Sequence, residues 1–265
     1  MTAARRAACG YLAMLLVAAA AGPLVLPGYE VQFREDVLAG PSARFPLGTD
    51  EFGRDRLSRL LHGARVSLAL APAAALLTAG IGGLAGILAA AGGWTERVVL
   101  GAADLLLCVP WLFLLLIIRA ALPLNLDAGT SLAVTFLLLG LLGWAGPARV
   151  TRAEVRRLAQ SDFIRQARAS GYSRHRLLLA QLLPAVRPVL AAQFWIAVPA
   201  FLLAEANLGL LGLGVSPPLP SLGSLLKELE NYGAVREHPA MLAPVLLLAT
   251  AVAAWQSAVR KERLS

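Results

Sequence analysis

Residues 149–187 read RVTRAEVRRLAQSDFIRQARASGYSRHRLLLAQLLPAVR, and this charged stretch decides how the chain folds. It holds nine arginines and only two acids, Glu154 and Asp162. The stretches on either side, Ser131–Ala148 and Pro188–Ala204, carry no charge at all. Because charged groups are costly to bury in hydrocarbon, the charged stretch must face water, whereas its neighbours need not.

The whole chain is more apolar than a soluble domain. Of its 265 residues, 58% are hydrophobic, and the mean hydropathy is +0.67, whereas soluble domains are roughly half apolar. A membrane-spanning helix needs about 20 mostly apolar residues. Helices also satisfy their own backbone groups in lipid, so the pattern predicts an all-α integral membrane protein with about six transmembrane helices. The six apolar runs are Tyr11–Pro27, Val66–Ala91, Val98–Ile118, Ser131–Ala148, Pro188–Ala204 and Met241–Val259.

The basic residues predict the orientation of these helices. In a soluble chain a net charge of +8 would suggest nucleic acid. Here the charge fits better with the tendency of arginine and lysine to collect on the cytoplasmic side, so no nucleic-acid partner is expected. If Arg5 and Arg6 are cytoplasmic, the alternation of six spans places the arginine-rich stretch 149–187 and both termini there too.

The segments predicted to lie outside carry little net charge. Residues 28–65 have six arginines against six acids, and Val215–Pro239 has two basic residues against three acids. The chain therefore divides into an N-terminal transmembrane helix (1–27), an extracytoplasmic segment (28–65), a five-helix core (66–259) that contains the cytoplasmic loop 149–187, and a cytoplasmic tail (260–265).

The first span has a second interpretation. Arg5 and Arg6, an apolar stretch and the small residues Ala18–Gly22 also resemble a secretory signal with its cleavage region. Cleavage would leave the orientation of the other five spans unchanged.

Glycines in the second span predict a tightly packed helix. Gly80, Gly82, Gly83 and Gly86 recur at helical spacing and include a Gly-x-x-x-Gly pair. Small residues let membrane helices approach closely, so we expect this helix to lie inside a bundle.

The outer segment 43–63 combines turns with a short amphipathic stretch. Pro46, Gly48 and Gly53 predict turns, and residues 57–61 predict a short surface helix at the membrane boundary that ends at Gly63. Asp50, Glu51, Asp55 and His62 match no metal-binding spacing. We expect these acids to pair with the four nearby arginines, and we assign no metal site.

Two short helices are predicted within the charged stretch. Ser161 can cap the first, which Gly171 ends, and Ser173 can cap the second. Pro184 is expected to end the second helix, and Pro188 suits the first turn of the next span. The result is a helix–turn–helix on the cytoplasmic face, with Phe163, Ile164 and Ala167 on one side.

At this point the chain resembles a known family. The run Gln166-Ala167-Arg168-Ala169-Ser170-Gly171, followed by Leu183-Pro184, is similar to the cytoplasmic coupling loop of bacterial ABC importer permeases. The outer motif, with Gly48, Thr49, Asp50, Gly53, Arg54 and Asp55, resembles the dipeptide, oligopeptide and nickel branch. So does the stretch from Leu203 to Ser221, and the resemblance covers roughly Phe45 to the C-terminus.

The resemblance implies the type I importer permease fold, in the bacterial inner membrane. Such a subunit pairs with a homologous permease, two cytoplasmic ATPases drive it, and an extracytoplasmic binding protein delivers a peptide or a related small solute such as nickel. ATP and Mg²⁺ would bind the ATPases, and this chain would carry no cofactor. Residues Phe163, Ile164, Arg165, Gln166, Ala167, Ala169, Gly171, Leu183 and Pro184 would form the ATPase-coupling loop.

Three positions depart from the family pattern. Arg165 replaces the leading glutamate of the coupling loop and Gln166 its first alanine, which predicts an ATPase partner with a compensating acidic residue. Leu222 stands where this branch usually has tryptophan.

Two acids lie within predicted spans, and such residues are functional candidates. Asp104 and Glu205 either line the translocation path or its gate, or they pair with an arginine, a backbone group or water.

Two other functions are considered. An ion-coupled secondary transporter working without an ATPase usually needs several intramembrane charges or broken helices. A membrane enzyme would need converging catalytic groups, but the three histidines lie in loops on both sides. The chain has no Walker A run, so we expect ATP hydrolysis on separate subunits.

Overall fold

The computed structural model describes residues 3–123 and 126–259, and these are almost entirely helical. In the described part of the chain the only β contacts are two isolated bridges, Gln32 with Arg54 and Thr49 with Asp55. The predicted all-α class is confirmed. The predicted tail Arg260–Lys261–Arg263 lies outside the described residues.

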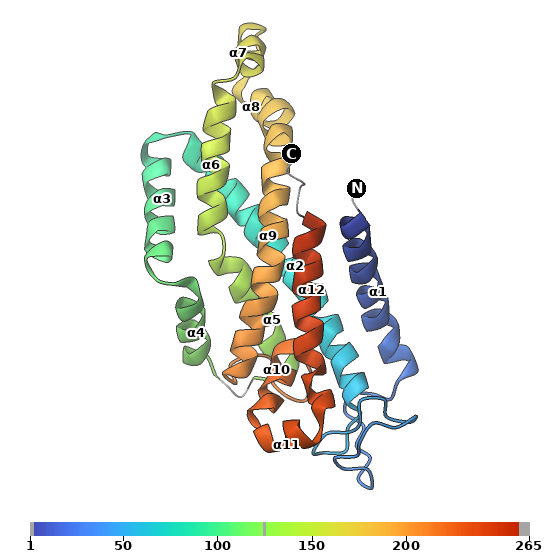
Figure 1. Cartoon of the computed structure of the whole chain (residues 1–265). Coiled ribbons are helices and arrows are strands. Elements are labelled where there is room, and N and C mark those ends of the chain that lie inside the picture. The colour runs from blue at the N-terminus through green and yellow to red at the C-terminus, as the bar shows by residue number, and fades with distance from the viewer. Residues whose placement is uncertain (1–2, 124–125, 260–265) are drawn as a thin grey trace. The chain divides into compact units, whose positions relative to one another are not determined.

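Figure 1 shows the helices of the chain with their labels. They are α1 Ala3–Val25, α2 Arg56–Ala90, α3 Gly93–Cys108, α4 Trp111–Ala121, α5 Ala128–Leu142, α6 Ala145–Ala159, α7 Asp162–Ala169, α8 Arg174–Leu177, the π turn η1 Leu178–Leu182, α9 Leu183–Leu210, α10 Leu222–Lys227, the 3-10 turn η2 Glu228–Glu230, α11 Tyr232–Glu237, the 3-10 turn η3 Pro239–Leu242 and α12 Ala243–Val259.

Two compact units make up the fold. The first comprises Met1–Ala71, Ile118–Phe136 and Pro199–Ser265, and the second comprises Pro72–Ile117 and Leu137–Val198. In the first unit α1 packs against α12, where the Tyr11 hydroxyl lies 2.5 Å from Thr250 Oγ1.

Within the described residues, five helical segments are long and apolar enough to cross a membrane, and a bent pair of helices adds a sixth if the pair forms one broken span. The five are Ala3–Val25, Arg56–Ala90, Ala128–Ala159, Leu178–Leu210 and Pro239–Val259. About six spans were predicted, and this number is confirmed.

The third predicted span, Val98–Ile118, is not one straight helix. It is broken between α3 and α4, which meet at 84°. Pro110 lies at the break and Val109 before it is extended, with φ −99° and ψ 130°. Proline lacks an N–H donor and disfavours a helical conformation in the residue before it, so the helix ends here.

The predicted short surface helix at residues 57–63 is wrong. These residues form the first two turns of α2, which runs without interruption through Gly63 into the second span. The outer segment therefore ends at Asp55 rather than at residue 65. Gly63 serves packing instead of termination, since a Cβ there would lie 3.1 Å from the Ser221 backbone and from Leu225.

The predicted break at Pro184 is also wrong. From Arg174 to Leu210 the chain is continuously helical, as α8, η1 and α9, and Pro184 and Pro188 both lie inside α9. The Leu183 N–H donates to the Leu178 carbonyl five residues earlier. Such a π turn inserts one extra residue into the helix, which accommodates the proline that follows.

The second unit confirms close packing of α2. A Cβ on Gly82 would lie 2.5 Å from Pro147, and one on Gly86 would lie 2.6 Å from the Ala148 carbonyl and from Thr151, both on α6. Val155 and Leu158 of α6 form a buried cluster with Val186 of α9, against which Ile87 of α2 packs.

Candidate functional site

The predicted coupling hairpin is built in the second unit around α7, which lies beyond the ends of α6 and α8 (Figure 1). Gly171 ends α7 as predicted. Its φ of +80° lies in the left-handed region, which glycine adopts without steric cost. The Tyr172 N–H then donates to the Ala167 carbonyl at 3.2 Å, which closes the helix end.

The two serines predicted as caps differ in their roles. Ser173 accepts a hydrogen bond from the Arg176 N–H at 3.3 Å, as expected of an N-cap. Ser161 has the extended conformation of an N-cap residue, but its hydroxyl donates to the Leu158 carbonyl at 2.5 Å. The Ser161 side chain therefore holds the junction with α6 and does not cap α7.

The side chains of α7 point in different directions. Ile164 is fully buried, Ala167 is half-buried and Phe163 is 42% exposed, so the predicted apolar side is split between the interior and the surface. Arg165, Gln166 and Ala169 are exposed, and Arg165 donates to Asp162 at 2.6 Å. Leu183 is half-buried and Pro184 is exposed at the beginning of α9.

Basic residues of α6 are paired with acids of α3. Glu96 accepts from both Arg152 and Arg156, and Asp104 accepts from Arg149. The Asp104 side chain is about half exposed, so the structure places this candidate pathway residue in an ion pair between two helices. Its role in a pathway or gate stays a prediction.

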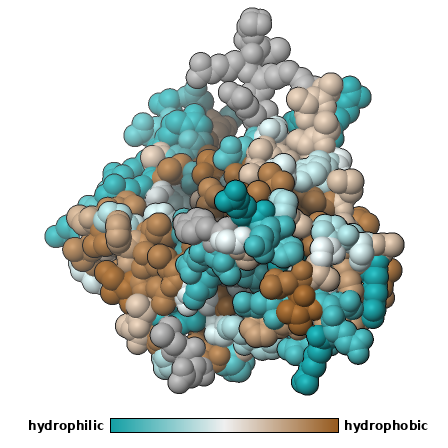
Figure 2. Space-filling model, turned by 60° about the horizontal axis from the view of Figure 1, so that its bottom comes forward, coloured by the Kyte–Doolittle hydropathy of each residue, from teal (hydrophilic) through white to brown (hydrophobic). Residues whose placement is uncertain are grey.

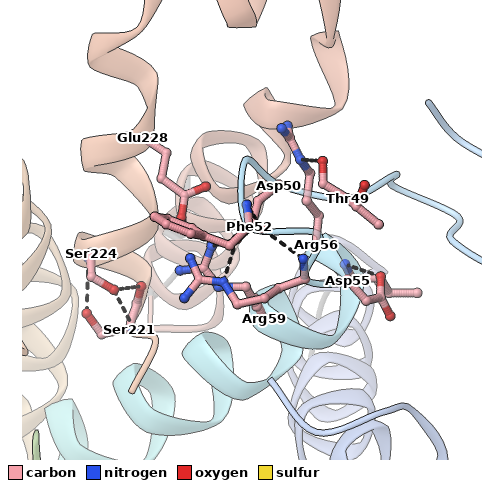
Figure 3. A network of polar contacts seen from close by, with 11 residues as sticks. Thr49, Asp50, Phe52, Asp55, Arg56, Arg59, Ser221, Ser224 and Glu228 are labelled. Atoms are coloured by element: carbon pink, nitrogen blue, oxygen red, sulfur yellow. Dashed lines mark hydrogen bonds and ion pairs between the residues drawn. The ribbon is translucent and has the colours of Figure 1, made fainter. Parts of the chain in front are cut away.

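The outer motif forms a compact polar network in the first unit. Asp50 accepts from Arg59 at 2.6 Å, and Arg59 also donates to Glu228 at 2.5 Å (Figure 3). Asp50 accepts from Arg54 Nε as well, at 2.7 Å. This confirms the predicted pairing of Asp50 with nearby arginines. Arg59 therefore connects the outer segment to the turn that follows α10.

The rest of the motif shapes the loop around Asp50. Gly48 and Gly53 both have positive φ, and Thr49 Oγ1 accepts from the Ala39 N–H at 2.8 Å. Asp55 pairs with no arginine among the residues described here, but it accepts from the Leu57 N–H at 3.0 Å, at the beginning of α2. Burial raises the pKa of the Asp55 carboxyl above its usual value.

Glu205 of α9 is fully buried in the first unit. Its carboxylate accepts from Ser221 at 2.5 Å, from Ser67 of α2 at 3.1 Å and from the Gly223 N–H at 3.1 and 3.2 Å. Gly223 approaches so closely that a Cβ there would lie 2.6 Å from the carboxylate. From the sequence, we expected Glu205 to pair with an arginine, a backbone group or water. The structure shows the backbone N–H of Gly223 as one partner, and the hydroxyls of Ser67 and Ser221 take the place of an arginine.

Sequence reasoning missed one buried charge, Arg119 of α4, which is only 1% exposed. It donates to Ser131 at 2.9 Å and to the Gly214 carbonyl at 3.3 Å. A signal was present in the sequence, because Arg119 lies between the apolar run 111–118 and two alanines, and arginine within an apolar span is rare.

The described residues thus combine helices that are able to span a membrane with a basic helical hairpin between two of them. A family model described as "Binding-protein-dependent transport system inner membrane component" matches residues 82–260. This match covers more than half of the chain. The chain therefore belongs to this family and is a multi-pass permease subunit of a binding-protein-dependent transport system.

Several proteins of similar sequence are named as permeases of transport systems. The chain is 33% identical, over 228 residues, to "Oligopeptide transport system permease protein OppC" of Mycobacterium tuberculosis (strain ATCC 25618 / H37Rv), which covers 84% of this chain and 77% of that protein. It is 35% identical to "Di/tripeptide transport system permease protein DppC" of Pseudomonas aeruginosa (strain UCBPP-PA14), over 84% of this chain and 75% of that protein. It is 29% identical to "Glutathione transport system permease protein GsiD" of Pectobacterium atrosepticum, over 93% of this chain and 81% of that protein.

Proposed function

We propose that this chain forms half of the translocation pathway of an ATP-driven importer for peptides or a related small solute. A homologous permease would supply the other half, two ATPases would bind on the cytoplasmic side, and a binding protein would deliver the solute from outside. The observation that carries this proposal is α7, a short helix held between α6 and α8 with one aromatic side chain exposed.

The construction of α7 suits docking to a motor subunit. Ile164 is buried and Gly171 closes the helix, so the helix is anchored at both its inner face and its end. Phe163 remains exposed and can enter an apolar groove of a soluble partner. Since α9 continues from α8 without a break, movement of the hairpin would pass directly into a membrane-spanning helix.

The proposed orientation places this hairpin in the cytosol. Nine arginines against two acids in residues 149–187 contrast with equal numbers of basic and acidic residues in residues 28–65. Basic residues favour the cytoplasmic side, so both termini would lie there too.

The solute is proposed from the relatives. Three of them are named for oligopeptide, di/tripeptide and glutathione transport, and all three solutes are peptides or peptide-like. We therefore favour a peptide over nickel as the solute of this importer.

Docking is tested with the complete importer in proteoliposomes. Phe163→Ala should reduce binding-protein-stimulated ATP hydrolysis and peptide uptake at least tenfold, as expected for an interface anchor worth about 2 kcal/mol. The matched control is Phe113→Ala on α4, a phenylalanine that is 61% exposed but lies within a span. Equal activity of both variants would contradict the docking role of α7.

A further inference from the structure

A cavity of about 700 Å³ lies within the first unit. The outer segment, the beginning of α2, the end of α4 and residues 209–241 line it. The face of the molecule that carries these segments presents hydrophilic and apolar residues side by side (Figure 2). Small-molecule sites typically have volumes of about 300–1,000 Å³, and the volume of this cavity lies within that range.

Charges around the cavity are unevenly compensated. Five basic and four acidic side chains line it. Asp50 forms ion pairs with Arg54 and Arg59. Glu228 also forms an ion pair with Arg59, so both acids are already neutralised by arginines of the outer segment and α2 (Figure 3). Of the other charged side chains that line the cavity, Arg56, Arg119 and Lys227 form no ion pair with any residue that the structure describes, and neither do Glu51 and Glu230.

Arg119 is the unusual member of this set. It is almost completely buried, yet only one of its guanidinium nitrogens, Nη2, donates to the protein. Its Nε and Nη1 are buried and have no hydrogen-bond partner among the described residues. A buried arginine without a counter-ion is strongly destabilising, so an anionic group is the expected complement.

We infer that the cavity binds a small solute through a carboxylate, with Arg119 as the principal donor. Guanidinium groups bind carboxylates through two parallel N–H donors, and Nε and Nη1 are the donors left over here. Val215, Leu219 and Met241 provide apolar wall for the remainder of the solute. The identification of this solute as a transported peptide rests on the proposed function.

The test compares a peptide that has a carboxylate with one that lacks it. The full chain in nanodiscs is titrated with trialanine and with trialanine amide, in which a neutral amide replaces the C-terminal carboxylate. Trialanine should bind at least about tenfold more tightly than the amide, as expected for a hydrogen bond to a charged group. Because both peptides meet the unaltered protein, this comparison does not depend on the folding of a variant.

Substitutions test whether Arg119 is the residue that causes the preference for the peptide with a carboxylate. Arg119→Gln should remove the difference between the two peptides, while Arg65→Gln should preserve it. Arg65 is an exposed arginine of α2 that does not line the cavity. Equal binding of both peptides by the unaltered chain, no saturable binding of trialanine, or an undiminished preference in a folded Arg119→Gln variant would each overturn the inference.

Uptake by the complete importer tests the proposed function separately. If the importer takes up peptides but Arg119→Gln shows no change in binding preference, the carboxylate site is wrong and peptide import stands. If the chain binds trialanine through Arg119 but the importer takes up no peptide, the carboxylate site stands and the peptide assignment is wrong.

Discussion

Glu205 and Asp104 are two carboxylates within apolar helices whose surroundings differ sharply. Glu205 is fully buried with three hydrogen-bonding partners, whereas Asp104 is about half exposed with one arginine. A buried acceptor that loses its bonds costs far more than an exposed ion pair. In the sequence both residues are acids within apolar runs. Only the structure shows that Glu205 is buried and that Asp104 is about half exposed.

Substitution of these carboxylates should therefore give unequal results. Glu205→Gln leaves one acceptor oxygen and puts an NH₂ group where the other oxygen accepts from a serine hydroxyl and the Gly223 N–H, so we expect a loss of about 1–3 kcal/mol in stability. Uptake by the importer should fall as well. Asp104→Asn should change stability by less than about 1 kcal/mol, because exposed ion pairs contribute little.

Thermal unfolding in detergent and uptake in proteoliposomes measure both effects, with membrane insertion checked for each variant. Full activity and unchanged stability of Glu205→Gln would show that this buried charge is dispensable.

The positive charge of Arg165 is expected to determine which ATPase can bind to α7. It pairs with Asp162 at 2.6 Å on the exposed surface of α7, so part of its charge is already compensated. Arg165→Glu would place two acids three residues apart, which costs only about 0.2–0.5 kcal/mol of helix stability. We nevertheless expect impaired transport with the native ATPase, because the reversed charge would face its proposed acidic partner residue.

Co-purification of the ATPase with each form of the permease separates docking from folding. The Arg165→Glu variant should insert normally and retain less ATPase. Unchanged ATPase retention and transport would remove the idea of a compensating acid.

At the scale of elements, the packing of α2 depends on particular glycines. A Cβ on Gly86 would lie 2.6 Å from α6, whereas a Cβ on Gly80 would meet no described atom within 4 Å. Both glycines belong to the same helix and the same apolar run, but only Gly86 lies in the helix contact.

Alanine substitution at these positions should reveal the contact. We expect Gly86→Ala to destabilise the second unit by about 1–3 kcal/mol, as overpacking does. Gly80→Ala should be neutral or slightly stabilising, since alanine favours the helix over glycine. Thermal unfolding of the two variants gives the comparison, and equal losses would show that α2 and α6 are not in such close contact.

Prolines illustrate how an element depends on its surroundings. Pro110 ends α3 and begins an 84° bend, while Pro184 and Pro188 lie inside α9. At Pro184 the preceding π turn accommodates the proline, and at Pro110 the chain bends instead. Sequence alone predicted a break at Pro184 and a straight helix at Pro110, and both expectations were wrong.

At the scale of the whole molecule, the proposed orientation can be measured by labelling. In a background with Cys9→Ala and Cys108→Ala, single cysteines are introduced as Ser42→Cys in the outer segment and Ser170→Cys after α7, both exposed positions. A membrane-impermeant maleimide should label Ser42→Cys in intact cells and Ser170→Cys only after permeabilisation, because basic segments stay inside. The reverse pattern would place the hairpin outside and contradict docking to a cytoplasmic ATPase.

The amino-acid sequence by itself determined the class of fold, the number of spans, the hairpin and its closing glycine. These features follow from the local pattern of apolar, charged and glycine residues, which acts through solvent preference and backbone geometry. Only the tertiary structure decided which polar groups meet. Glu205 finds Ser67 138 residues away, and Arg119 approaches Gly214 at a separation of 95 residues. Such contacts depend on how distant helices pack, because burial and hydrogen bonding are properties of the assembled helices and no local pattern encodes them.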